Sequence, residues 1–287
     1  MQRVGGDVNT QVYGTIQNAI DAIGATSGAN DAPRADGSIE IYPADEAYTG
    51  PVVVDTAHLD IEAFGQATEL QSDSSVNLLS IETNDVFISD LAVDHTGTGS
   101  NDAVYSDSGT DETQLFRVSV DNAPRYGFNI NASFSHLLAC EGTGGGTAAL
   151  KLSGDRSQAH NFKAQSPTAD GVLIDGNSCT FDGVIFDAGD YGMTLNGVSC
   201  RVDASIAASD SDGLLIGGIG GHIVNAIVTT STDDDVVISS DGNFVMVRAQ
   251  QTVVIESGAE DNVVMGYAGS SLTDNGTNNN TDNLLVP

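Results

Sequence analysis

The stretch Gly171–Asp234 decides the fold, because it consists of three similar rows. From residue 171 it reads GVLIDGNSCTFDGVIFDAGDY, from 192 GMTLNGVSCRVDASIAASDSD, and from 213 GLLIGGIGGHIVNAIVTTSTDD. A period of 21 or 22 residues, with small and apolar residues in fixed columns, is the signature of a solenoid. The short apolar runs, separated by Gly, Asp, Ser and Asn, predict strands rather than helices. We therefore predict coils whose strands pair with the same strands one coil above and below.

The repeat extends in both directions from this stretch. Gly127 lies two coils of about 22 residues before Gly171, and Leu150, Leu152 and Ser157 of the intervening row fall into its columns. After Asp234 the rows become shorter. We predict about ten coils in one domain: a lead-in with a capping helix over 1–30, a β-helix over 31–268, and a Ser/Asn/Gly-rich tail over 269–287.

The N-terminal region has the spacing of a helix. Ile16, Ala19, Ile20 and Ile23 form one apolar stripe, and Gly24 is expected to end the helix. We expect this helix to cover the open edge of the first coil, after an irregular segment over 1–10. The following loop, Thr26–Gly37, is expected to be exposed, and the first strands are predicted at 38–42, 51–54 and 58–64.

This opening resembles that of the pectate-lyase-like right-handed β-helix family, of the type found in viral tailspikes. The similar features are the helix around Ile16–Ile23, the loop, the segment Gly37-Ser-Ile-Glu-Ile-Tyr-Pro43, then Tyr48 and a Val-rich strand. The resemblance implies an all-β fold, a single-stranded right-handed parallel β-helix. Its motif content is low, so it speaks for the architecture far more than for an activity.

The charge balance is the second strong signal. Forty acidic residues stand against nine Lys and Arg, for a net charge of -31. The regular apolar columns argue against a disordered acidic chain. The Asp-rich, Lys-poor composition resembles that of proteins from extreme halophiles, where a Debye length of about 3 Å at 1 M salt screens self-repulsion. Without a basic patch, nucleic acid is not expected as a partner.

Other segments carry weaker signals. No run approaches 18 apolar residues, so no membrane span is expected, and the residues after Met1 do not predict a signal peptide. No cofactor is expected. Acidic turns such as 107–112 and 233–235 suit Ca²⁺ or salt ions, but no twelve-residue loop of the EF-hand kind is present and solvated turns are the default interpretation. Cys140, Cys179 and Cys200 lack metal-ligand spacing and are expected to be buried thiols, although a disulfide between the last two is within reach.

Paired carboxylates are the main candidate for catalysis. Asp182 and Asp203 share a column one coil apart, and glycoside hydrolysis uses two carboxyl groups at such a spacing. Asp is also a common turn residue, so chance stacking is the alternative. The candidate binding residues are Tyr191, Asp190, Asp212 and Arg201. Tyr191 offers a flat face to a sugar ring. Arg201 suits a lyase base or an ordinary salt bridge. His222 is expected to be a wall or turn residue.

The leading functional hypothesis is a non-enzymatic virion protein of a halophilic archaeal virus. It would be a spike, fibre or capsid-decorating protein, assembled in the host cytoplasm, exposed outside the cell and bound to a host surface glycan or glycoprotein. We expect a homotrimer in contact with other virion proteins, and the candidate oligomerisation residues are Leu173, Leu215, Leu284, Leu285 and Val286. The alternative is a polysaccharide lyase or glycoside hydrolase that uses the paired Asp residues. A third hypothesis is a surface protein of a haloarchaeal cell.

Overall fold

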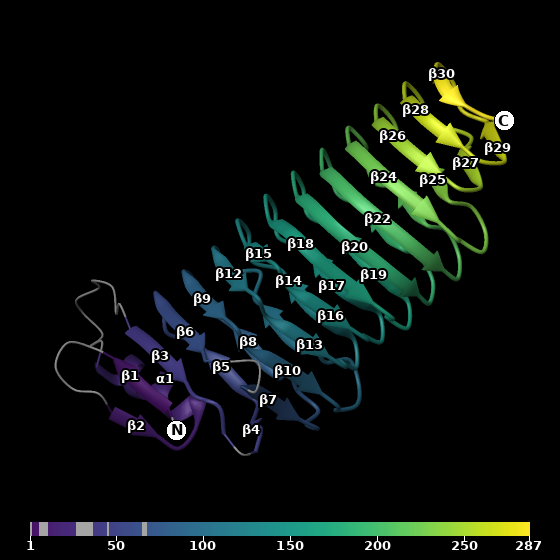
Figure 1. The fold of residues 1–287 in the computed structure, drawn as a ribbon. Helices are drawn as coiled ribbons and strands as arrows, with labels where there is room; N and C mark the ends of the chain where they lie inside the picture. Colours follow the sequence, from purple (N-terminus) through teal and green to yellow (C-terminus); the bar gives the residue numbers. More distant parts are fainter. Residues whose placement is uncertain (1, 6–10, 27–36, 45, 65–67) are drawn as a thin grey trace.

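The protein forms an all-β parallel solenoid of about 11 turns, seen as a rod in Figure 1. This computed structural model describes residues 2–5, 11–26, 37–44, 46–64 and 68–287. Within these residues no helix is long and apolar enough to cross a membrane. The prediction of a parallel β-helix from the repeated rows is confirmed.

Two sheets run along the rod. The 11-stranded sheet, here sheet B, has one strand in each coil. Its members are β5 (Val52–Val54), β8 (Leu79–Ile81), β11 (Val104–Ser106), β14 (Tyr126–Ile130), β17 (Ala148–Leu152), β19 (Asp170–Ile174), β21 (Met193–Leu195), β23 (Leu214–Ile216), β25 (Val236–Ile238), β27 (Thr252–Ile255) and β29 (Ser271–Asp274).

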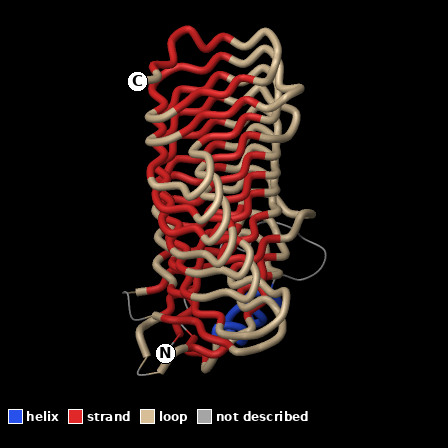
Figure 2. Tube along the Cα trace, turned by 90° about the vertical axis from the view of Figure 1, so that its right-hand side faces the viewer, coloured by secondary structure: helices blue, strands red, loops and turns tan. Residues whose placement is uncertain are grey.

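The 19-stranded sheet, here sheet A, occupies the rest of each coil. Its members are β1 (Gln2–Gly5), β2 (Gln11–Tyr13), β3 (Gly37–Ile41), β4 (Tyr48–Thr49), β6 (Leu59–Ala63), β7 (Glu69–Ser72), β9 (Val86–Ser89), β10 (Ala92–His95), β12 (Thr113–Phe116), β13 (Ser119–Asp121), β15 (His136–Leu138), β16 (Glu141–Thr143), β18 (Gln158–Gln165), β20 (Thr180–Ala188), β22 (Arg201–Ser209), β24 (Ile223–Thr229), β26 (Phe244–Ala249), β28 (Val263–Ala268) and β30 (Asn280–Leu285). Early coils have two short strands in this sheet. From β18, which pairs with both β15 and β16, each coil has one long strand. Figure 2 shows the strands stacked along the rod.

The core is a continuous column of like side chains. Leu150, Val172, Met193, Leu214 and Val236 lie in register on successive strands of sheet B, and all are fully buried. A single coil cannot remove these side chains from water, but its neighbours can, which couples the stability of each coil to the next.

The N-terminal cap agrees with most of the expectations. In α1 (Ile16–Thr26) the stripe of Ile16, Ala19, Ile20 and Ile23 is buried, and the helix continues past Gly24. The prediction of an irregular segment over 1–10 was wrong for 2–5, because β1 pairs antiparallel with β2 and β3. Residues 27–36 of the expected loop lie outside the described residues.

The C-terminal segment is a further coil rather than a tail. β29 pairs with β27 and β30 pairs with β28, both in parallel. Leu284 is only 8% exposed and packs into the core. It is therefore not available to a second chain, contrary to our expectation that it takes part in oligomerisation. Leu285 and Val286 are exposed. The segment contributes few inward apolar residues, mainly Leu272 and Leu284, and its outer positions are rich in Asn. The pattern of hydrophobic residues therefore does not predict these strands.

A ladder of buried polar side chains follows one corner of the rod. The amide oxygen of Asn262 accepts hydrogen bonds from the backbone N–H and the side chain of Asn243, both at 2.9 Å. Asn243 accepts in turn from the backbone N–H of His222, whose Nδ1 accepts from that of Cys200. His222 is 1% exposed and belongs to the wall, as predicted. All three cysteines are free and buried, and burial raises the pKa of Cys140 to about 12.

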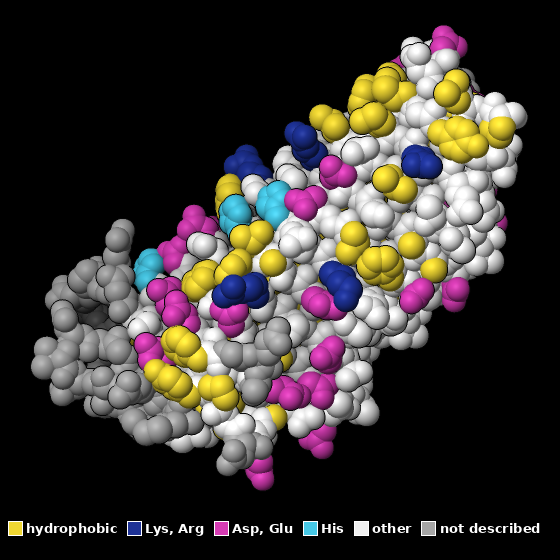
Figure 3. All heavy atoms as spheres, viewed as in Figure 1, with side chains coloured by type: hydrophobic (Ala, Val, Ile, Leu, Met, Phe, Trp, Pro, Cys, Tyr) yellow, Lys and Arg dark blue, Asp and Glu magenta, His cyan; other side chains and the backbone are white. Residues whose placement is uncertain are grey.

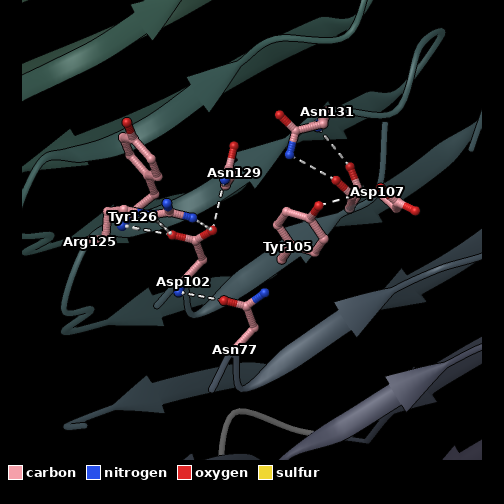
Figure 4. Close-up of polar contacts among 9 residues, drawn as sticks. Asn77, Asp102, Tyr105, Asp107, Arg125, Tyr126, Asn129 and Asn131 are labelled. Atoms are coloured by element: carbon pink, nitrogen blue, oxygen red, sulfur yellow. Dashed lines mark hydrogen bonds and ion pairs between the residues drawn. The ribbon is translucent and has the colours of Figure 1, made fainter. Parts of the chain in front are cut away.

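One buried ion pair joins early coils of the rod (Figure 4). The Asp102 carboxylate, which is fully buried, accepts hydrogen bonds from Nε and Nη2 of Arg125 at 2.8 and 2.6 Å. It also accepts from Asn129 Nδ2 at 2.8 Å and from the backbone N–H of Tyr126 at 3.3 Å. Four donors thus replace the water that this carboxylate loses on folding.

Candidate acid–base groove

A groove of about 750 Å³ lies on the outer face of sheet A in the middle of the rod. It crosses β18, β20, β22 and β24, and its polar lining residues are His160, Asn161, Thr180, Asp182, Arg201, Asp203, Ser205 and Asn225. Side chains that point outward from a parallel sheet stack one coil above another, about 4.8 Å apart, so the groove is built from columns of the repeat.

Asp182 and Asp203 are register partners in this groove, as the row alignment predicted. Asp182 Oδ1 accepts the backbone N–H of Asn161 at 2.8 Å, and Asp203 Oδ1 accepts Asn225 Nδ2 at 3.2 Å. Both side chains remain accessible from the groove. The strand spacing of about 4.8 Å is close to the 5–5.5 Å that separates the two carboxyl groups of retaining glycosidases.

His160 is the functional candidate that our sequence analysis missed. Its Nδ1 is paired with Asp182 Oδ2, and its Nε2 lies 3.0 Å from Gln158 Oε1. A bulge between Ala159 and Phe162 places His160 and the next residue, Asn161 (φ 51°), against Asp182. Bulges re-aim side chains in this way. The signal was present in the sequence, because the 22 residues from His160 to Asp182 equal one coil.

Arg201 lines the same groove from β22 and is exposed. In the part of the chain that the structure describes, no carboxylate oxygen lies within 4 Å of its guanidinium, unlike those of Arg117 and Arg125. The salt-bridge alternative for Arg201 is therefore not what the structure shows. A guanidinium beside two carboxylates and an imidazole is free to bind an anionic group of a ligand.

The other three predicted binding residues lie outside this groove. Asp190, Tyr191 and Asp212 lie on the loops before β21 and β23, near Asp170. Burial, and then the charge of Asp190, raises the pKa of Asp170 to about 6. Burial also raises the pKa of Asp212 and of Tyr191. Among the described residues no group of three or more His, Cys, Asp or Glu is arranged to hold a metal ion.

A second depression of about 620 Å³ lies on the same face nearer the N-terminus. It is lined by Phe64, Phe87 and Phe116 together with Glu62, Ser89, Asp90 and Arg117. Phe64 stacks on Tyr42 with ring centroids 5.2 Å apart, and the Arg117 guanidinium lies 4.3 Å from the Phe116 centroid. From β9 to β20 there are four strand-to-strand steps, so the two depressions are about 19 Å apart along one face.

The fold is that of a right-handed parallel β-helix, and the candidate acid–base residues lie on an outer face of its sheet A. Solved structures that share this fold include the A-modules of the Azotobacter vinelandii mannuronan C-5 epimerases AlgE4 and AlgE6. Each has a TM-score of 0.65 and 14% sequence identity, covering 95% of this chain and 94% of the other. At this identity the likeness establishes the fold alone. No protein-family model matches the chain, and no curated protein matches it in sequence.

Proposed function

We propose that the chain acts on a polysaccharide through acid–base chemistry in the groove of β18–β24. The observation that carries the proposal is the His160–Asp182 pair beside Asp203 and the free guanidinium of Arg201. The fold that this chain shares with two polysaccharide-acting epimerases supports the same class of substrate. The earlier alternative of a lyase or hydrolase with paired Asp residues belongs to this class.

The residues suit a substrate that contains uronic acids. Arg201 binds the sugar carboxylate and thereby makes the neighbouring C–H bond more acidic. His160 removes that proton through Nε2, once the Gln158 amide turns away from this nitrogen, while Asp182 orients the imidazole through Nδ1 and stabilises the imidazolium that forms. Return of a proton from water to the opposite face gives the epimer, and the proton taken by His160 then leaves to solvent. Loss of the glycosidic oxygen at the adjacent carbon gives chain cleavage, with Asp203 as the proton donor.

One experiment separates these reactions. Polymannuronate is incubated with the protein in D₂O at molar salt and followed by proton NMR. Deuterium at C-5 indicates epimerisation, new olefinic signals indicate elimination, and new reducing ends indicate hydrolysis. We expect His160→Gln and Asp182→Asn each to lower the rate at least about 100-fold. Tyr191→Phe, outside the groove, is the matched control. A reaction that proceeds unchanged in both groove variants would refute this assignment.

The second candidate is attachment without catalysis, as in a virion spike or fibre bound to a host glycan. The aromatic depression at Phe64, Phe87 and Phe116 favours it, because aromatic faces bind sugar rings without any chemistry. Viral origin, a halophilic host and a trimer all belong to this proposal. The test is the binding of host-cell polysaccharide to the wild-type protein and to Asp182→Asn. Equal binding by both proteins, with the polysaccharide recovered intact, would favour attachment over catalysis.

A further inference from the structure

The outer face of sheet A becomes more apolar towards the C-terminus of the rod. Strands β24, β26 and β28 and the last coil expose a group of apolar side chains, here the C-terminal apolar patch: Ile223, Ile227, Phe244, Met246, Met265, Tyr267 and Leu285. Register joins them, since Ile223 lies beside Phe244, Met246 beside Met265 and Tyr267 beside Leu285. The exposed fraction is 54% for Ile223 and 69% for Leu285. Figure 3 shows yellow side chains gathered over this end.

The three central strands of the patch are also free of acidic residues, and Asp282 of β30 is the one acid on the strands of the patch. The three strands Ile223–Thr229, Phe244–Ala249 and Val263–Ala268 contain no Asp or Glu, and Arg248 is their one charged residue. The chain as a whole has 40 acidic residues and a net charge of -31. Two such chains repel each other over most of their surface, and this patch is where they can approach with the least electrostatic cost.

The chemistry of the patch suits a protein rather than a glycan or a membrane. Ile and Met side chains offer no hydrogen bonds to sugar hydroxyls, whereas Met, Tyr, Phe and Arg are enriched at the centres of protein interfaces. An anionic membrane surface would repel a chain with this net charge.

We propose that a second copy of this chain docks on the C-terminal apolar patch. An apolar face whose three central strands carry no acid meets an identical face without needing a matched charge pattern, and isologous pairing is the commonest form of homo-oligomer. The patch is also continuous with the acid–base groove, because Ile227 belongs to the patch and lines the groove. A second copy would therefore form a wall at the open C-terminal end of the groove.

The size of the patch determines the expected strength. Four strands about 4.8 Å apart, each with about six residues at 3.3 Å, cover roughly 19 by 20 Å, or about 400 Å². A standard interface buries about 800 Å² on each partner. We therefore expect weak association that becomes stronger with salt, because salt screens the repulsion between the two chains.

The test is the mass of the full chain by sedimentation equilibrium, at up to about 1 mM chain and from 0.1 to 3 M NaCl. Wild-type protein should rise from one chain mass towards two as salt and concentration increase. Met246→Asp and Tyr267→Ser should each shift the midpoint to at least about tenfold higher concentration. Phe134→Asp is the control, because Phe134 is similarly exposed (40%) but lies outside the patch.

Three results would overturn the proposal. The first is a single-chain mass for the wild type under every condition. The second is association that Met246→Asp and Tyr267→Ser leave unchanged. The third is association that Phe134→Asp weakens as much as they do. Circular dichroism of each variant confirms the fold, and Ile227→Ser is a second, milder change in the same patch. None of these outcomes depends on whether the groove acts on a polysaccharide.

Discussion

Replacing Asp102 by Asn should destabilise the rod far more than the same replacement at Asp90. Both residues form a two-point ion pair with an arginine, Asp102 with Arg125 and Asp90 with Arg117. The pairs differ in burial. The Asp102 side chain is fully buried, whereas those of Asp90 and Arg117 are 31% and 56% exposed. Each variant removes one negative charge, so the change in net repulsion is the same in both.

The expected magnitudes follow from this difference. Breaking a buried ion pair costs about 3–5 kcal/mol, because the guanidinium that remains has lost the negative charge that compensated it. Arg125 is 34% exposed and recovers part of its hydration, so we expect the low end, about 3 kcal/mol. The Asn129 amide adds to the cost, since its Oδ1 has no hydrogen-bond partner among the described residues and its Nδ2 would lose the carboxylate. An exposed pair such as Asp90–Arg117 contributes about 0.2–1 kcal/mol.

The assay is urea unfolding at one fixed salt concentration, followed by circular dichroism, for the wild type, Asp102→Asn and Asp90→Asn. The midpoint and slope of each transition give the free energy of unfolding. If Asp102→Asn lost less than about 1 kcal/mol more than Asp90→Asn, burial would not control the strength of these pairs. Arg125→Met in the Asp102→Asn background should recover part of the loss, because it removes the unpaired cation.

Three further changes test other parts of the structure. The raised pKa of Asp170, about 6, means that the folded state holds this proton more tightly than the unfolded chain, so its contribution to stability falls as the pH rises from about 4 through 6. The free energy of unfolding of Asp170→Asn, relative to that of the wild type, should rise by about 1 kcal/mol from pH 4 to pH 7, a value that allows for the partial exposure of Asp170. Urea titrations at both pH values measure it, and the same stability difference between variant and wild type at pH 4 and pH 7 would contradict the prediction. Gly154→Ala would place a Cβ 2.0 Å from the backbone oxygen of Ala132 in the preceding coil and should cost about 1–3 kcal/mol, whereas Gly109→Ala, with no neighbour among the described residues nearer than 3.9 Å, should cost much less in the same assay. Asn243→Ala removes an acceptor and donors from the buried ladder to Asn262 and should lower the thermal midpoint, with a loss of about 1–3 kcal/mol; an unchanged midpoint would show that the ladder adds no stability.

The sequence alone predicts the fold in the coils whose rows have apolar residues at the inward positions. The inward positions of Gly171–Asp234 repeat strictly, and register pairs such as Val172 with Met193 follow from the row alignment. It was insufficient where the inward residues were sparse. In the last coil, Leu272 and Leu284 alone carry the pattern, so the sequence predicts a tail where the structure has strands at 271–274 and 280–285.

The candidate site was predicted in part for the same reason. Asp182 and Asp203 were placed together because they lie in regular strands of equal row length. Tyr191 lies away from these two residues, on the loop before β21. Its position near a row boundary does not indicate on which face of the rod its side chain lies. His160 was missed because a local bulge, rather than the strand pattern, directs it to Asp182, although its spacing of one coil was visible.

The uniform stacking of coils means that distances along the outer face come in fixed steps of about 4.8 Å. The aromatic depression and the acid–base groove are separated by four such steps. Removing or duplicating one complete row of about 22 residues between them would change their separation by one step and leave each lining intact. The number of rows, rather than any single residue, therefore sets the spacing between the two depressions.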